Sequence, residues 1–443
     1  MNLSRILNRM ADWKSVIRAL KYPNFRLFFA GQSISLVGTW IQQIAMSWLV
    51  YRLTKSAFLL GVVGFTSQIP TFLLAPFAGV LADHWNRHRM IIFTQIFSMI
   101  QALLLAVLVL TNMIAVWQII ILSIFLGLIN AFDIPARQSF IVEMIEDKSD
   151  LGNAIALNST MVNSARLIGP SIAGILISLV GEGFCFLING LSYLAVILSL
   201  ILMKIVSQKV TTHRPDVIKG LKEGFSYAFA FPPIRAIILL LALISLMGSS
   251  YMVLMPIVAT KVLHGGAHTL GFLMGAAGLG ALIGAIYLAA RRSVRGLFSM
   301  LPFAGGLFGF SLLIFSLSRS LWFSFILLLI TGFGMIMQMA SSNTVLQTIV
   351  DDNKRGRVMS IYTMAFMGMA PFGSLLVGGL ANSLGVPVTL MLSGLVSIIG
   401  SLFFAWKLPS LRESIRPIYV KMGIIQEVSP GIPTPPELAP PEK

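Results

Sequence analysis

The sequence predicts an all-α membrane protein with about twelve transmembrane helices in two pseudo-symmetric six-helix bundles and with both termini in the cytoplasm. Four observations lead to this prediction. The 443 residues are 56% apolar and only 11% charged, against about 25% charged in an ordinary soluble protein. The apolar residues gather in runs long enough to cross a bilayer. The basic residues gather in loops on one side of these runs, and a set of glycines repeats between the two halves.

The predicted spans follow one another with short polar loops between them. Each has about the 20 residues that a helix needs to cross 30 Å of hydrocarbon. They are continuously apolar, whereas a barrel strand would alternate over about ten residues, so we expect helices. Their approximate bounds are 25–51, 58–82, 90–111, 115–136, 154–180, 184–206, 234–260, 269–290, 297–317, 321–346, 358–382 and 386–406.

The distribution of Lys and Arg predicts the orientation of these spans. With a cytoplasmic N-terminus, 27 of the 32 basic residues fall on the inside and four on the outside, and Arg166 alone lies within a span. Cytoplasmic loops carry such an excess of positive charge. The net charge of +16 is therefore explained without a nucleic-acid partner.

Three polar segments flank or divide the spans. Residues 1–23 form a basic amphipathic arm, which we expect to lie on the inner leaflet. Residues 207–233 are predicted to link the first bundle, 24–206, to the second, 234–408. Residues 409–443 gather prolines, which predicts a disordered cytoplasmic tail.

Four glycines recur at one offset and indicate an internal repeat. Gly152, Gly169, Gly174 and Gly181 are each followed 204 residues later by another glycine, at 356, 373, 378 and 385. The segment YPNFRLF at Tyr22 is echoed by FPPIRAI at Phe231. A duplicated six-helix unit with a site between its copies is the architecture that alternating-access transporters use.

Several kinds of chemistry are not expected. The single cysteine, Cys185, excludes an intramolecular disulfide and a cysteine-based metal site. His84 and His88 have zinc-like spacing but belong to a basic loop, and His264 and His268 have poor neighbours for a metal. The glycine spacings after Gly271 are similar to those of nucleotide-binding loops, but they lie inside a span and no Gly-Lys-Ser/Thr follows them. We therefore predict no metal, no cofactor and no enzymatic activity.

The loop between the second and third spans carries a recognisable motif. It reads GVLADHWNRHR from Gly79 to Arg89, which resembles the signature of the major facilitator superfamily. The residues Gly79, Leu81, Asp83, Arg87 and Arg89 match that signature. Asn86 replaces the usual glycine, which matters little if it adopts the left-handed conformation that Asn tolerates. The resemblance implies that Asp83 and the arginines form a cytoplasmic charge cluster that gates the transporter.

The fifth span carries RLIGPSIAG, similar to the antiporter signature of that superfamily. Gly169, Pro170 and Gly174 match it. Their alternative role is ordinary close packing of helices, which we also assign to Gly373 and Gly378. The superfamily's arginine in the fourth span is replaced by Ser123, so the role attached to that arginine does not carry over.

Short segments at Asp133, Gly169 and Arg355 resemble the bacterial branch that includes the enterobactin exporter. This resemblance implies a monomeric multi-pass protein of the bacterial inner membrane that exports a small amphipathic molecule, such as a siderophore or drug, against proton entry. Lysophospholipid transport is an alternative. A scaffold or membrane enzyme without transport has no supporting motif.

Two charged residues within spans are candidate functional groups, because a charge in hydrocarbon costs about 2.5 kcal/mol or more. Arg166 could bind an anionic or catecholate-like substrate, or be a structural residue paired with carbonyls or an acid. Asp133 could be a proton-coupling acid with a raised pKa, or form an ion pair with Arg137 or Arg87.

Further candidates rest on the resemblance alone. The superfamily lines its cavity with the first and seventh helices. The resemblance therefore implies that Gln32 and Gln43 of the first span, and Ser249 and Tyr251 of the seventh, face the substrate; snorkelling or a hydrogen bond to a neighbouring helix is the alternative for each.

Overall fold

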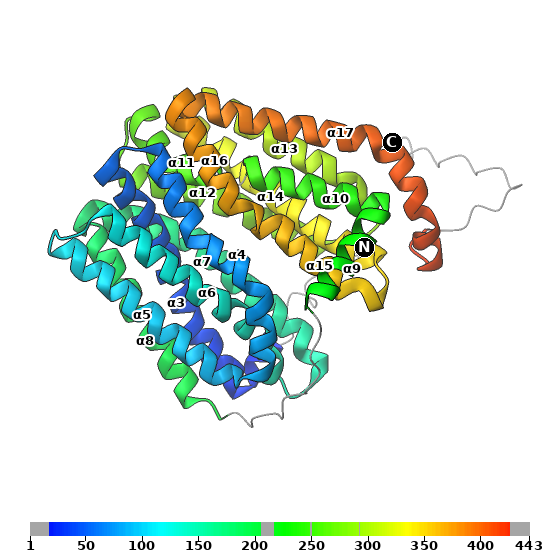
Figure 1. Ribbon diagram of the computed structural model, residues 1–443, viewed down its shortest axis with the longest axis horizontal. Helices are drawn as coiled ribbons and strands as arrows, with labels where there is room; N and C mark the ends of the chain where they lie inside the picture. Colours follow the sequence, from blue (N-terminus) through cyan, green and yellow to red (C-terminus); the bar gives the residue numbers. More distant parts are fainter. Residues whose placement is uncertain (1–16, 205–216, 249, 292, 426–443) are drawn as a thin grey trace, which may run out of the picture.

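The computed structural model describes residues 17–204, 217–248, 250–291 and 293–425, without the side chains of 75–84, 217–221 and 352–353. Every element in these ranges is helical (Figure 1). Within the described ranges, eleven helical segments are long and apolar enough to cross a membrane. The helix Pro23–Thr54 is also long, with 32 residues, but is more polar because it carries several glutamines. The prediction of an all-helical membrane protein is confirmed.

Six long helices form an N-terminal bundle, within which α3 packs on α7 and α8, and α6 packs on α4 and α5. Apolar side chains form its interior, with buried aromatic rings such as Phe28 and Phe140. The helices are α3 (Pro23–Thr54), α4 (Ala57–His84), α5 (Arg87–Leu110), α6 (Val116–Glu143), α7 (Leu151–Val180) and α8 (Glu182–Leu202).

The remaining long helices form a C-terminal bundle, within which α13 packs on α14 and α17, and α12 packs on α14. Figure 1 shows the two bundles side by side, the first in blue to green and the second in green to orange. The second contains α10 (Pro232–Leu243), α11 (Tyr251–Ile257), α12 (Ala267–Ala290), α13 (Leu297–Leu317), α14 (Leu321–Ile349), α15 (Asp352–Met367), α16 (Met369–Leu384) and α17 (Val386–Lys421).

The seventh and eleventh predicted spans are not single α-helices. In the seventh, two π-helical segments, Ile244–Gly248 and Val258–Val262, flank α11. Pro256 lies inside α11 and cannot donate an intrahelical hydrogen bond. The eleventh span is interrupted at Gly368, where α15 ends and α16 begins.

The predicted disordered tail is wrong for its first part, since α17 continues to Lys421. Leu411, Ile415 and Tyr419 are spaced four apart and are 5%, 2% and 9% exposed. They form one buried stripe of a helix, while Pro409 and Pro417 are exposed. Residues 426–443 lie outside the described residues.

The predicted arm and linker are partly described. Residues 1–16 and 205–216 lie outside the described residues, so the predicted interfacial helix stays a prediction. The arm's last residues, Arg18–Lys21, form a 3-10 helix that docks at the start of α7: Lys21 Nζ lies 2.6 Å from Oδ2 of Asp150, the residue before α7. Within the linker, Val217–Ala230 forms helix α9, and its Glu223 pairs with Arg357 of α15 at 2.6 Å.

The two bundles contact each other through α7 against α12 and through α4 against α16. At both contacts glycine faces glycine. A Cβ added to Gly174 would lie 2.8 Å from Gly271 Cα, and one added to Gly378 would lie 2.8 Å from Gly61 Cα. Only glycine permits backbones this close. The two helix pairs therefore meet backbone to backbone.

The four glycines repeated in the sequence have matching surroundings in the two bundles. Gly169 packs on α3 at Val37 and Trp40, and Gly373 packs at Leu246 and Ser250 of the corresponding segment. The pair Gly181 and Gly385 has positive φ, +84° and +85°, at the turns that precede α8 and α17. Gly152 and Gly356 have open space where a Cβ would lie. The sequence repeat thus corresponds to equivalent packing.

Candidate functional site

The candidate substrate site lies where α7 and α11 approach from the two bundles. Arg166 is halfway along α7, is half-buried, and its guanidinium carbon lies 5.6 Å from the ring centroid of Trp40 on α3. A cation over an indole face is attracted by the ring quadrupole. Tyr251, a neutral phenol, begins α11 and lies within electrostatic range of Arg166. The structure therefore brings together two residues that are 85 positions apart in the sequence.

Neither the Arg166 guanidinium nor the Tyr251 hydroxyl has an ion-pair or hydrogen-bond partner in the described part of the chain. Arg166 has no ion pair among the described residues, although its charge lies within a span. Tyr251 is 0% exposed, and its hydroxyl has no hydrogen-bond partner in the described part of the chain. The Tyr251 ring contacts Phe308 of α13 with centroids 6.3 Å apart. A desolvated hydroxyl without a partner is costly, but the Tyr251 side chain is fully enclosed in this arrangement, so it could meet a ligand beside Arg166 only after the helices around it move.

The other predicted cavity residues have different surroundings. Gln32 is 2% exposed with its Oε1 unpartnered, so it does not face open space. Gln43 is exposed. Its neighbour Gln42 is buried and donates to Gln101 Oε1 at 2.9 Å. Ser249 lies outside the described residues.

Asp133 is buried in α6 with three partners. Its Oδ1 accepts hydrogen bonds from Thr94 Oγ1 and Gln95 Nε2, both at 2.8 Å. Its Oδ2 lies 3.1 Å from Arg137 Nη2, one turn later. These contacts give both carboxylate oxygens a partner. Of the two predicted ion-pair partners, Arg137 is the one that the structure places on Asp133.

The predicted gating residues surround the end of α4 and the start of α5. Gly79 and Asp83 lie in α4, but their side chains are not described. Arg87 Nη1 pairs with Glu143 Oε1 of α6 at 2.8 Å. Arg89 is exposed.

Asn86 does not adopt the left-handed conformation considered above. It has φ −66° and ψ 106°, and its side chain accepts a hydrogen bond from the Arg89 backbone N–H. Asn is a favoured N-cap residue because it satisfies a free N–H at a helix start. The residue that replaces the usual glycine is therefore explained as the cap of α5.

A buried glutamine on α14 was missed in the sequence. Gln338 is 1% exposed, and both its amide atoms lack partners among the described residues. It lines a cavity of about 10 Å³ together with Ser245 and Phe366, which is about the space of one water molecule. The signal was a polar amide inside an apolar span.

The comparisons with known proteins agree with this geometry. Residues 14–419 match the family model described as transmembrane secretion effector, of the major facilitator superfamily. The chain belongs to this family. It is therefore a transporter and not an enzyme.

Its relatives carry different substrates. The staphyloferrin A transporter of Staphylococcus aureus is 29% identical over 86% of this chain and 95% of its own length. The multidrug efflux pump Tap of Mycolicibacterium fortuitum is 24% identical over 88% of this chain and 97% of its own. Macrolide efflux protein A of Streptococcus pyogenes is 22% identical over 85% of this chain and 95% of its own length. A multi-pass membrane transporter with bacterial relatives is thus established.

A solved structure shows the same fold. A bacterial homologue of the human lysosomal transporter Spinster, in an inward-facing and occupied conformation, superposes with a TM-score of 0.68. The superposition covers 89% of this chain and 98% of the Spinster homologue, and the two sequences are 13% identical. The fold is that of the major facilitator superfamily.

Proposed function

We propose that this transporter exports a small amphipathic molecule that carries an anionic group, of the siderophore or drug type, by alternating access. The observation that carries the proposal is Arg166, a cation at mid-span without an acidic partner in the described chain, placed against Trp40 and beside Tyr251. Trp40 offers an aromatic surface and Arg166 a charge, which is the combination that an amphipathic anion requires.

The free-energy cost of placing the Arg166 charge within a span favours a ligand-binding role over a purely structural one. A charge within a span costs about 2.5 kcal/mol or more, and a hydrogen bond between charged groups contributes about 1.5 to 3 kcal/mol. An anionic substrate would offset part of the cost of burying Arg166. Because Trp40 and Arg166 belong to one bundle and Tyr251 to the other, substrate contact would also link the bundles.

The packing between the bundles supports alternating access. The glycine contacts lie on the parts of α4 and α16 near Ala57 and Leu384, and on the corresponding parts of α7 and α12. Towards the opposite ends, Gly152 and Gly356 have no close neighbours at their Cβ positions. With the predicted orientation of both termini in the cytoplasm of a bacterial inner membrane, this is an inward-facing arrangement.

Proton coupling is the finer part of the proposal. Asp133 is the candidate acid, and coupling through it requires the contact with Arg137 (3.1 Å) to open during the cycle, because Thr94 and Gln95 hold Oδ1 and Arg137 holds Oδ2. We also propose that the transporter works as a monomer, because a single chain contains both bundles.

Substrate binding to purified variants tests the role of Arg166. The probes are a carboxylate siderophore, a catecholate siderophore and a macrolide. Arg166→Gln should weaken binding of the preferred anionic probe by about 10- to 150-fold, the equivalent of one charged hydrogen bond, while Arg166→Lys should retain part of the affinity. Arg319→Gln, at an exposed arginine outside the site, is the matched control.

A structural role for Arg166 predicts the reverse pattern. Arg166→Gln would then lower the unfolding temperature in detergent and leave affinity unchanged. Tyr251→Phe removes only the unpartnered hydroxyl, so a loss of affinity without a loss of stability would support the site independently.

A further inference from the structure

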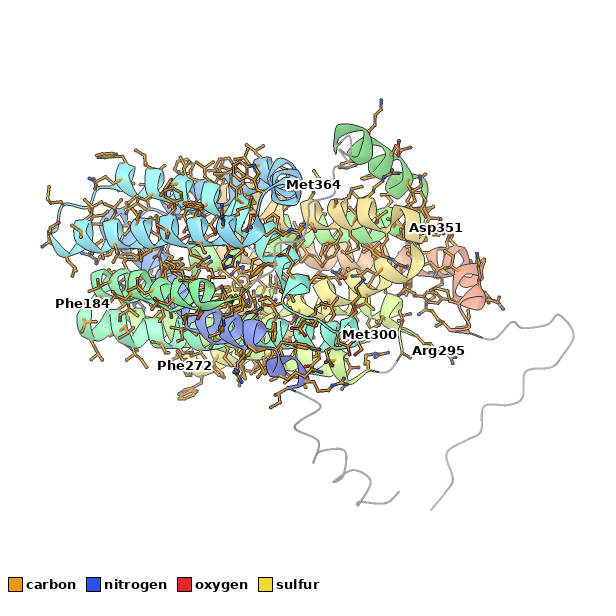
Figure 2. The ribbon with its side chains drawn as sticks, turned by 90° about the horizontal axis from the view of Figure 1, so that it is seen from below. Phe184, Phe272, Arg295, Met300, Asp351 and Met364 are labelled. Carbon is orange, nitrogen blue, oxygen red and sulfur yellow. The ribbon has the colours of Figure 1, made fainter. Side chains whose placement is uncertain are left out.

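A second cavity lies far from the Arg166 site, between the first turn of α13 and the C-terminal part of α17. Its volume is about 290 Å³, and arginine side chains line it together with apolar ones. Figure 2 shows Arg295, at the start of this region, at the same end of the molecule as Asp351 and opposite Phe184. By the predicted orientation this is the cytoplasmic end.

The cavity carries an excess of positive charge. Arg295, Arg412 and Arg416 line it with one acid, Glu413. None of these four side chains forms an ion pair within the described residues. Arg412 donates from Nε to Ser299 Oγ at 3.1 Å, which holds its guanidinium at the cavity edge. A planar guanidinium binds phosphate oxygens in pairs.

The floor of the cavity is apolar and holds one unpartnered hydroxyl. Phe298 is 3% exposed and Ile415 is 2% exposed. Tyr419 is 9% exposed, and its hydroxyl has no hydrogen-bond partner among the described groups. A ligand that suits this cavity therefore combines an anionic head with an apolar part.

The cavity lies beside the lipid headgroup layer. Trp406 of α17 is 75% exposed, as is typical of an aromatic residue at the membrane interface, and Lys407 lies over the Phe403 ring at 4.8 Å. Along a straight helix Arg412 would lie about 9 Å beyond Trp406, just outside a headgroup layer of about 5 to 8 Å. The end of α17 turns away from the axis of its spanning part (Figure 1), so this end does not continue straight away from the membrane.

We propose that this cavity binds the phosphate headgroup of an anionic phospholipid. The guanidinium groups of Arg412, Arg416 and Arg295 hold the phosphate, the Tyr419 hydroxyl donates to it, and the glycerol and first acyl carbons cover Phe298 and Ile415. Basic pockets beside transmembrane helices recognise anionic headgroups by this chemistry. The site is separate from the proposed substrate path.

Native mass spectrometry of the full chain in a non-ionic detergent tests the proposal. The probes are phosphatidylglycerol, phosphatidylcholine and glycerol 3-phosphate, titrated against the wild type and the double variant Arg412→Gln, Arg416→Gln. The wild type should retain one phosphatidylglycerol more tightly than phosphatidylcholine, and the double variant should bind it at least about tenfold more weakly.

A charge-matched control separates a built site from general attraction to a basic protein. Arg26→Gln with Arg235→Gln removes two exposed arginines that do not line the cavity. It should leave phosphatidylglycerol affinity within about twofold of the wild type. Tyr419→Phe, which keeps the packing of the ring, should weaken binding by a smaller factor than the arginine pair.

Two outcomes would overturn the proposal. Equal loss of affinity in both double variants would show unspecific charge attraction. Displacement of the lipid by millimolar glycerol 3-phosphate, with comparable affinity for the soluble compound, would assign the cavity to a free phosphate ligand instead. An unchanged unfolding temperature of the double variant Arg412→Gln, Arg416→Gln in the non-ionic detergent would confirm that this variant is folded.

Discussion

Gly378→Ala should force the two bundles apart at the contact of α4 and α16. The added Cβ would lie 2.8 Å from both Gly61 Cα and Ala57 O. These are backbone atoms, so no side chain can rotate away. Ordinary van der Waals contact begins at 3.4 Å, and the helices must therefore separate by about 0.6 Å or tilt by an equivalent amount.

The expected effect on the conformational equilibrium follows from the cost of overpacking. An extra methyl in a tight contact costs about 1 to 3 kcal/mol. The higher helix propensity of Ala contributes equally with the bundles in contact or apart, because α16 is helical in both. The population with α4 and α16 in contact should therefore fall by about 5- to 150-fold relative to the separated state.

Gly379→Ala is the matched control for this change. Gly379 is the next residue of the same helix, and a Cβ there meets nothing within 4 Å. Spin labels at Lys55 and Leu384, near the same contact, report the distance between the bundles. The native Cys185 is 0% exposed and should not take up the label.

We expect a longer distance distribution and slower transport in proteoliposomes for Gly378→Ala, with both properties of Gly379→Ala close to the wild type. Identical distance distributions in the two variants would refute the reasoning that backbone contact between the glycines sets the equilibrium. Loss of folding in Gly378→Ala alone would show that the contact is structural in every state.

Three further predictions concern charged groups. Asp83→Asn should abolish or strongly slow transport with insertion and unfolding temperature unchanged, because a gating residue does not contact substrate; normal turnover would contradict this. Asp133→Asn should abolish proton-driven accumulation but retain downhill exchange if Asp133 is the coupling acid, whereas loss of both together with expression would indicate a structural role of its pair with Arg137. The hydrogen bond to Asp150 raises the pKa of Lys21 above 10.5, so the docking of Arg18–Lys21 at the start of α7 should weaken as the pH rises through the raised value and, at the acid end, as Asp150 is protonated, and should be constant between these limits. Lys21→Met should weaken it throughout that range, measured by hydrogen exchange.

Much of the fold could be predicted because a bilayer strongly restricts the backbone. Every N–H and C=O in hydrocarbon must be bonded within the segment, so a continuous apolar run becomes a helix. The bounds predicted for 297–317 are those of α13. The prediction failed beyond the membrane, where prolines suggested a disordered tail but the buried stripe from Leu411 to Tyr419 continues α17.

The candidate site was only half predictable. Arg166 and Asp133 could be found because each is a charge in an apolar run. The partners of these two side chains could not be predicted, because their functional and structural roles differ only in which helix lies opposite each side chain. The placement of Arg137 on Asp133 and of Trp40 under Arg166 depends on helix rotation, which apolar runs without clear periodicity do not define. Gln338 was missed for the same reason.

By itself, the sequence determined the helical class, the approximate bounds of the spans and the glycines shared by the two halves, since these follow from hydrophobic length and from the repeat. The tertiary structure alone decided which glycines face each other, namely Gly174 with Gly271 and Gly61 with Gly378, and which polar groups remain without a partner. Burial and pairing are properties of two surfaces in contact, and a linear pattern describes only one of them.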